Sequence, residues 1–148
     1  MNIVRAATEH IDSIAPLFDQ YRQFYEQDAD LEACRDYIRQ RLENNESVIF
    51  LALSGTGQGL GFTQLYRSFC SLAMREIIYL YDLYVAPEAR RTGTGRALMD
   101  RAREYAWQQG AERLTLETHV SNSQAQALYE SLGWKKDDEF LTYHLACQ

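Results

Sequence analysis

A short segment near the middle of the chain reads Arg90-Arg91-Thr92-Gly93-Thr94-Gly95-Arg96 and separates two runs of opposite character. It follows the β-branched and aromatic run 77–85, which is typical of a buried strand. It precedes the run 97–107, which is rich in helix formers and has helical apolar spacing. A strand, an arginine- and glycine-containing turn and a helix N-terminus together present backbone N–H groups to an anion. We therefore expect a phosphorylated small molecule to bind at this turn.

Plainer explanations of the same turn stay open. The glycines also suit an ordinary connection between a strand and a helix, because they adopt backbone conformations that other residues resist. The arginines also suit a solvated surface. Two nucleotide-binding motifs are excluded, since Leu98 stands where G-x-G-x-x-G needs its third glycine and no Gly-Lys-Ser/Thr is present.

The composition is that of a single domain, 1–148, with enough apolar material for a core, because 46% of its 148 residues are hydrophobic. The formal net charge of −6 argues against general nucleic-acid binding, which usually needs a basic surface. No signal-peptide core occurs, and no apolar run approaches the roughly 20 residues of a membrane span. Three cysteines without metal-ligand spacing indicate free thiols in a reducing compartment. We expect a cytoplasmic protein that binds no nucleic acid and no membrane.

The order of apolar patterns predicts a mixed α/β sheet with helices on its faces. Strands are expected at 3–6, 48–53, 60–66, 77–85, 113–118 and 140–145. Helices are expected after Thr8 as N-cap with a kink or break at Pro16, at 31–42, from Thr94 to Gly110, and from Asn122 or Ser123 to Leu132. The glycine-rich stretch 54–59 lies between two strands and predicts a hairpin turn.

Two blocks of the sequence resemble the GCN5-related N-acetyltransferase (GNAT) family. The first is Arg90-x-x-Gly93-x-Gly95 after Asp82-Leu83-Tyr84-Val85-Ala86-Pro87, which is similar to the acyl-CoA-binding signature of that family. The second is Asn122-x-x-Ala125-x-x-Leu128-Tyr129-Glu130-x-Leu132-Gly133-Trp134. Their order and separation fit the family over nearly the whole chain. Tyr21-x-x-Phe24-Tyr25 and Trp134 also resemble the subgroup that acetylates polyamines, amino acids and basic protein tails.

The resemblance implies a mostly antiparallel sheet with a splayed parallel strand pair, helices on both faces, and acetyl-CoA as cosubstrate with no metal. The splayed strands would end at Val85 and Thr118, and the pantetheine arm would pair with the strand edge that they expose, often at a bulge. The diphosphate would lie on the amides from Arg91 to Arg96 at the helix N-terminus, with arginine side chains adding contacts. The cofactor-binding residues implied are Leu83, Tyr84, Val85, Arg90, Arg91, Thr92, Gly93, Thr94, Gly95, Arg96, Asn122, Ala125 and Tyr129.

Tyr129 is the candidate general acid, because the resemblance implies that its hydroxyl approaches the CoA sulfur and protonates the departing thiolate. A packing tyrosine in an amphipathic helix is the alternative. Asn122 has a structural alternative as well, since an N-cap alone would explain it.

The general base is left open. Several family members carry a glutamate on the central strand at positions that match Tyr79 or Tyr81, and neither is a carboxylate here. Asp82 is the candidate within this strand, although alternation turns it away from the face of those tyrosines unless a bulge intervenes. Glu117, His119, a water relay and a tyrosine are alternatives, and Asp82 also fits a buried structural acceptor.

The acceptor is expected to be a small cationic primary amine, such as a polyamine or an amino acid. Acidic residues, among them Glu26 and Asp28, follow Tyr21 and Tyr25 between the first two helices, which form the acceptor groove in the family. Carboxylates beside aromatic faces suit a cation, whereas a solvated acidic loop is the plainer interpretation. A non-catalytic acyl-CoA sensor and a protein lysine or N-terminal acetyltransferase are alternative functions. Aromatic residues late in the chain also permit a homodimer.

Overall fold

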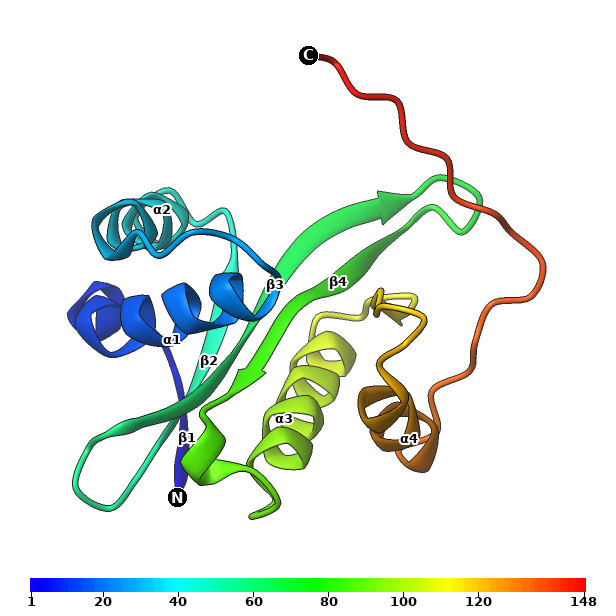
Figure 1. Ribbon diagram of the computed structural model, residues 1–148. Coiled ribbons are helices and arrows are strands. Elements are labelled where there is room, and N and C mark those ends of the chain that lie inside the picture. Colours follow the sequence, from blue (N-terminus) through cyan, green and yellow to red (C-terminus); the bar gives the residue numbers. More distant parts are fainter. The chain divides into compact units, whose positions relative to one another are not determined.

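The computed structural model describes residues 1–148 and divides into two compact units, Met1–Glu117 and Thr118–Gln148. The first unit contains one five-stranded sheet of order β1-β2-β3-β4-β5 (Figure 1). Its strands are β1 Asn2–Arg5, β2 Val48–Leu53, β3 Gly59–Cys70, β4 Arg75–Val85 and β5 Leu114–Thr115. Neighbouring strands are antiparallel, except that β5 runs parallel to β4. The mixed α/β fold with one parallel pair is therefore confirmed.

Two helices, α1 Ile11–Phe24 and α2 Leu31–Glu43, cover one face of the sheet. Their apolar side chains form a core with those of β2, β3 and β4, and the ring of Phe18 meets that of Phe62 edge-on at 6.2 Å. Burying an aliphatic or aromatic side chain of this size contributes about 1.5–3 kcal/mol. This packing places α1 directly over the middle of the sheet.

The expected N-cap of α1 at Thr8 is wrong, and of the kink or break expected at Pro16, the break is wrong. Thr8 does not cap the helix; it begins a 3-10 turn, η1 Thr8–His10, in which the Ala7 N–H donates to His10 Nδ1 at 3.0 Å. Pro16 does not break the helix, which continues to Phe24. The proline removes one backbone donor, but the buried residues that follow it keep this segment packed on the sheet.

The opposite face of the sheet is covered by α3 Thr94–Gln108, which follows the short turn η2 Pro87–Ala89. Leu98, Ala102 and Tyr105 are buried on its inner side, as the spacing predicts, and the Tyr105 ring meets Phe50 of β2 at 5.8 Å. The helix ends before Gly110, whose φ of +69° is favourable for glycine.

A bulge interrupts the pairing of β3 with β4. Gln64 faces Asp82, whereas the next residue of β3, Leu65, faces Leu80, so Tyr81 is the extra residue. Bulges bend a strand and change where its side chains point. This bulge decides the orientation of Asp82.

The parallel pair β4–β5 is short. Ile78 faces Leu114 and Tyr79 faces Thr115, and β4 then continues to Val85 without β5 beside it. The divergence agrees with the expected splayed pair, whereas the strand expected at 113–118 is reduced to Leu114–Thr115. A strand requires a hydrogen-bonded neighbour, and the divergence of β4 removes that neighbour.

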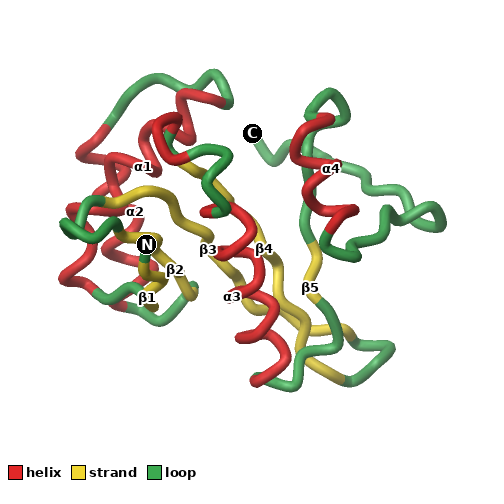
Figure 2. The backbone as a smooth tube through the Cα atoms, turned by 90° about the horizontal axis from the view of Figure 1, so that it is seen from below, coloured by secondary structure: helices red, strands yellow, loops and turns green.

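The second unit contains one helix, α4 Ser123–Ser131. Asn122 caps it, because its Oδ1 accepts from Ala125 N–H at 3.2 Å, and Gly133 with φ of +89° follows the helix as expected. No strand forms at 134–148, which is drawn as loop throughout in Figure 2, so the strand expected at 140–145 is wrong. None of the helices has the length and apolar character needed to cross a membrane.

Candidate functional site

Asp82 lies on the face of the sheet that α1 and α2 cover. Its side chain accepts from Gln64 Nε2 at 2.8 Å and from the hydroxyl of Tyr21 in α1, and the residue is 6% exposed. Because of the bulge, it points to the same face as Tyr81, whose ring meets Tyr66 of β3 at 5.3 Å. The sequence-based objection to Asp82, that alternation turns it away, is therefore removed.

Burial controls the protonation of this group. It raises the pKa of Asp82 above the ordinary value, whereas the hydrogen bonds from Gln64 and Tyr21 lower it. Burial and the neighbouring Asp82 carboxylate also raise the pKa of Tyr21, so its phenol keeps the proton that it donates. A carboxylate with a raised pKa and fixed donors is suited to accept a proton from a bound amine.

Tyrosine rings surround Asp82 and lead from it to the surface. The Tyr21 ring meets Tyr25 at 5.1 Å and Tyr84 at 6.2 Å, and both contacts are edge-on. Tyr25 is 44% exposed and Tyr81 is 66% exposed, so the outer rings of this group face solvent. Aromatic faces beside a buried carboxylate form an environment that favours a cation.

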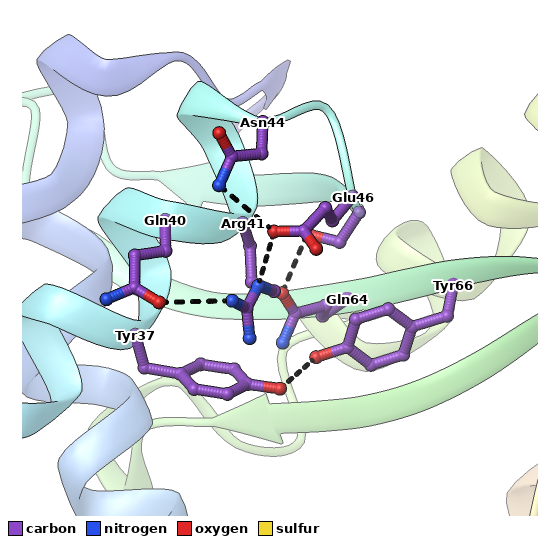
Figure 3. A network of polar contacts seen from close by, with 8 residues as sticks. Tyr37, Gln40, Arg41, Asn44, Glu46, Gln64 and Tyr66 are labelled. Carbon is purple, nitrogen blue, oxygen red and sulfur yellow. Dashed lines mark hydrogen bonds and ion pairs between the residues drawn. The ribbon is translucent and has the colours of Figure 1, made fainter.

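A second polar group adjoins this aromatic cluster. The hydroxyls of Tyr37 in α2 and Tyr66 in β3 are 2.8 Å apart, and the Arg41 guanidinium lies 4.4 Å from the centre of the Tyr37 ring (Figure 3). Arg41 is in turn paired with Glu46 at 3.3 Å. Gln64, Tyr66 and Tyr37 were not predicted from the sequence as parts of the site. The only signal in the sequence was Gln64, which follows Thr63 in a strand whose other residues are mostly apolar.

The acidic stretch between α1 and α2 divides into two kinds of residue. Asp30 has a structural role, because its Oδ1 accepts from Ala33 N–H at 3.1 Å and caps α2. Glu26 and Asp28 are exposed, and Glu26 has a left-handed φ of +63°. Of the predicted substrate residues, Tyr21 thus reaches the buried carboxylate directly and Tyr25 contacts Tyr21, whereas Glu26 and Asp28 lie at the surface.

The N-terminus of α3 is open to an anion. Gly93 is its N-cap with a φ of +87°, no side chain caps the helix, and its first turn contains no acidic residue. Arg91 also has a left-handed φ of +61°, so the chain turns sharply on both sides of Thr92. The Thr92 hydroxyl donates to the Ala89 carbonyl at 2.6 Å and holds this turn. Uncapped N–H groups and the partial positive charge of a helix N-terminus favour a phosphate.

The outer end of β4 lies beyond the pairing with β5 and contains Leu83, Tyr84 and Val85. The Arg90 Nε donates to the Val85 carbonyl at 3.0 Å, and its guanidinium carbon lies 5.7 Å from the centre of the Tyr84 ring. Arg90 is therefore held against the end of β4 by its Nε and by the Tyr84 ring.

The second block of predicted site residues lies in the second unit. Asn122 acts as the N-cap of α4, and Ala125 donates to it. The Tyr129 ring lies 6.2 Å from that of Trp134, and the Tyr129 carbonyl accepts from the Trp134 N–H. His119, an alternative base, is bonded through Nδ1 to Ser121 Oγ at 2.7 Å. The roles of these residues in transfer stay predictions.

The central strand is bulged, its parallel neighbour diverges from it, and the helix that follows has an uncapped N-terminus. These features fit the acetyltransferase fold that the resemblance implied. The model of the Acetyltransferase (GNAT) family matches residues 11–134, and the chain belongs to this family.

Similar proteins agree with this assignment. Uncharacterized N-acetyltransferase YhfO of Bacillus subtilis (strain 168) is 47% identical over 145 residues, which are 98% of this chain and 97% of that protein. A crystal structure of a probable acetyltransferase has 43% identity and a TM-score of 0.95, and covers 100% of this chain and 99% of its own. Thialysine N-epsilon-acetyltransferase of Caenorhabditis elegans is 23% identical over 97% of this chain and 90% of its own length.

Proposed function

We propose that this N-acetyltransferase moves an acetyl group from acetyl-CoA to the primary amine of a small cationic acceptor, by direct transfer within a ternary complex. The single observation that carries the acceptor class is the buried Asp82 carboxylate within a group of tyrosine rings. Family membership supports the acyl-transfer chemistry.

The residues at the start of α3 fit the diphosphate of a coenzyme A thioester. Backbone N–H groups from Arg91 to Arg96 would bind it, and the absence of a capping side chain leaves them available. Backbone groups of Leu83 to Val85 would pair with the pantetheine arm, because β4 has β3 on one side there but no strand on the side of β5. The bound thioester supplies an acyl group activated toward an amine.

The acceptor amine would enter among Tyr21, Tyr25 and Tyr81 and pair with Asp82. A primary amine is protonated at neutral pH and must lose a proton before it attacks a carbonyl carbon. Asp82 would bind the ammonium and accept that proton, and Tyr129 would protonate the departing thiolate. Glu26 and Asp28 at the surface would attract cations toward the site. The thialysine N-epsilon-acetyltransferase among its relatives supports an amine of an amino acid as one acceptor.

A panel of amines tests this function. Purified protein is incubated with acetyl-CoA and with cationic, neutral or acidic primary amines, and free thiol release is measured. We expect polyamines and basic amino acids to react fastest, and Asp82→Asn to lower kcat/KM at least about a hundredfold because it removes both the ion pair and the base. Faster reaction of neutral or acidic amines would contradict the acceptor class. If the protein binds acetyl-CoA but acetylates no amine, the alternative function as a non-catalytic acyl-CoA sensor is favoured.

A further inference from the structure

A chain of three buried polar side chains crosses the sheet beneath α1 and α2. Ser47 precedes β2, Gln64 lies in β3 and Asp82 lies in β4, and they are 8%, 0% and 6% exposed. The Ser47 hydroxyl donates to Gln64 Oε1 at 2.8 Å, and Gln64 Nε2 donates to Asp82 Oδ2 at 2.8 Å. Polar groups in such a place are costly unless every one is bonded, and here each of the three has a partner within the chain.

The chemistry of the three groups determines the direction of the chain. An ionised carboxylate only accepts hydrogen bonds, so the amide of Gln64 must turn its NH₂ toward Asp82 and its oxygen toward Ser47. The Ser47 hydroxyl then supplies the proton that the amide oxygen accepts. The structure has the amide in the orientation that an ionised carboxylate requires, with Nε2 toward Asp82 and Oε1 toward Ser47. The donors present thus match an ionised Asp82.

The bulge makes this contact possible. Gln64 lies directly opposite Asp82, and the extra residue Tyr81 follows immediately in the register. Gln64 from β3 and Tyr21 from α1 hold the carboxylate from two sides. A carboxylate has about four acceptor positions, so two such bonds leave capacity for an ammonium group.

We propose that Gln64, held by Ser47, is a positioning residue that keeps the Asp82 carboxylate ionised and oriented toward the acceptor amine. This inference rests on the proposed function in one respect, the identity of the group that Asp82 meets. The orientation and charge of Asp82 can be measured without it.

Other ionisable groups on this face also act on Asp82 or on its hydrogen-bond partners, and none of them is changed in the Gln64, Ser47 and Thr63 variants. These groups are Tyr21 of α1, Tyr25 just after α1, Tyr37 and Arg41 of α2, Tyr66 of β3 and Tyr81 of β4.

The direct test is an NMR titration of Asp82. The protein is labelled with ¹³C at the aspartate carboxyl carbons, and the Asp82 signal is identified by its loss in Asp82→Asn. In Gln64→Met, which keeps the chain length but removes the donor, we expect the pKa of Asp82 to rise by about one unit, because a donor to the charged form lowers it. An unchanged or lowered pKa would overturn the proposal.

Thr63→Val is the matched control. Thr63 is also 0% exposed, and its hydroxyl donates to the backbone carbonyl of Asp82 at 2.9 Å rather than to the carboxylate. This variant loses a buried bond to the same residue, but we expect its Asp82 pKa to stay within a few tenths of a unit of the original. If Gln64→Met folds poorly, the double variant Ser47→Ala/Gln64→Met removes the unpaired hydroxyl as well, and the same rise is expected.

The kinetic test separates this inference from the proposed function. If Asp82 serves transfer, the acidic limb of kcat/KM against pH moves upward in Gln64→Met by the same amount as the NMR pKa, whereas it stays in place in Thr63→Val. If the NMR pKa of Asp82 rises in Gln64→Met but the acidic limb of the kcat/KM profile stays in place, the role of Gln64 in the reaction is overturned. If no amine is acetylated, the proposed function fails, and the NMR titration still decides whether Gln64 controls the charge of Asp82.

Discussion

Asp82 is removed from water by the packing of α1 against β3 and β4, and it keeps two protein donors in place of the lost hydration. Removal from water penalises its charged form, and the donors compensate for part of that penalty. The balance leaves a pKa above the ordinary value, which makes the residue a better proton acceptor than an exposed aspartate.

This raised pKa predicts how stability depends on pH. A group whose folded-state pKa is raised contributes stability below its ordinary pKa of 3.8 and loses that contribution as the pH rises through the folded-state value. We expect the free energy of unfolding of the original protein to fall relative to that of Asp82→Asn as the pH rises above 3.8. Urea denaturation of both proteins between pH 4 and 8 measures the difference. A difference that grows in favour of the original protein would contradict the raised pKa.

Tyr129→Phe tests the second catalytic assignment. The change removes only a hydroxyl and keeps the ring that packs near Trp134. If that hydroxyl protonates the leaving thiolate, kcat should fall about 10²- to 10⁴-fold, whereas the affinity for coenzyme A measured by calorimetry should stay the same. An unchanged kcat would remove Tyr129 from the mechanism.

At the scale of elements, the turn before α3 combines backbone strain with open amides. Gly93 adopts a φ of +87°, and a Cβ built there would meet no atom within 4 Å. Position 93 therefore needs glycine because of its backbone conformation, and not because a side chain would clash with the rest of the protein. A methyl group at this position would still occupy space in front of the helix N-terminus.

Two glycine variants separate these effects. Gly57 in the β2–β3 turn has a nearly identical φ of +85° and equally open surroundings, so Gly57→Ala matches Gly93→Ala in backbone cost. We expect each to lower the free energy of unfolding by about 1–2 kcal/mol. Only Gly93→Ala should also weaken coenzyme A binding, by roughly tenfold or more, in a calorimetric titration. Equal binding by both variants would place the diphosphate elsewhere.

Most element types were predictable from local patterns, whereas strand lengths were not. The apolar spacing of α1 and α3 and the glycine signals at Gly110 and Gly133 correspond to the helices observed. Strand ends depend on neighbours far away in the sequence, which is why β5 is shorter than expected and 140–145 forms no strand. The bulge at Tyr81 has the same origin, since it is defined only by the register with β3.

At the scale of the whole molecule, the chain forms two compact units, and the family match at 11–134 extends across both. The prediction of one domain can be tested because each unit contains one tryptophan, Trp107 in the first and Trp134 in the second. In Trp107→Phe, fluorescence reports the second unit, whereas circular dichroism reports mainly the helices and sheet of the first. We expect coincident urea transitions for a single cooperative domain. Two separated midpoints would show that the units unfold independently.

Local chemistry in the chain was enough to identify the family and to predict an anion-binding turn and the candidate acid Tyr129. Glycine conformations, helix spacing and motif order act between residues close together in the sequence, and these can be recognised without a structure. The surroundings of Asp82 could not be recognised in this way. Its orientation depends on a one-residue register change, and its charge depends on Gln64 and Tyr21, which come from two other elements. Tertiary packing alone brings these groups together and takes them out of water, and that removal makes an ordinary aspartate a candidate base.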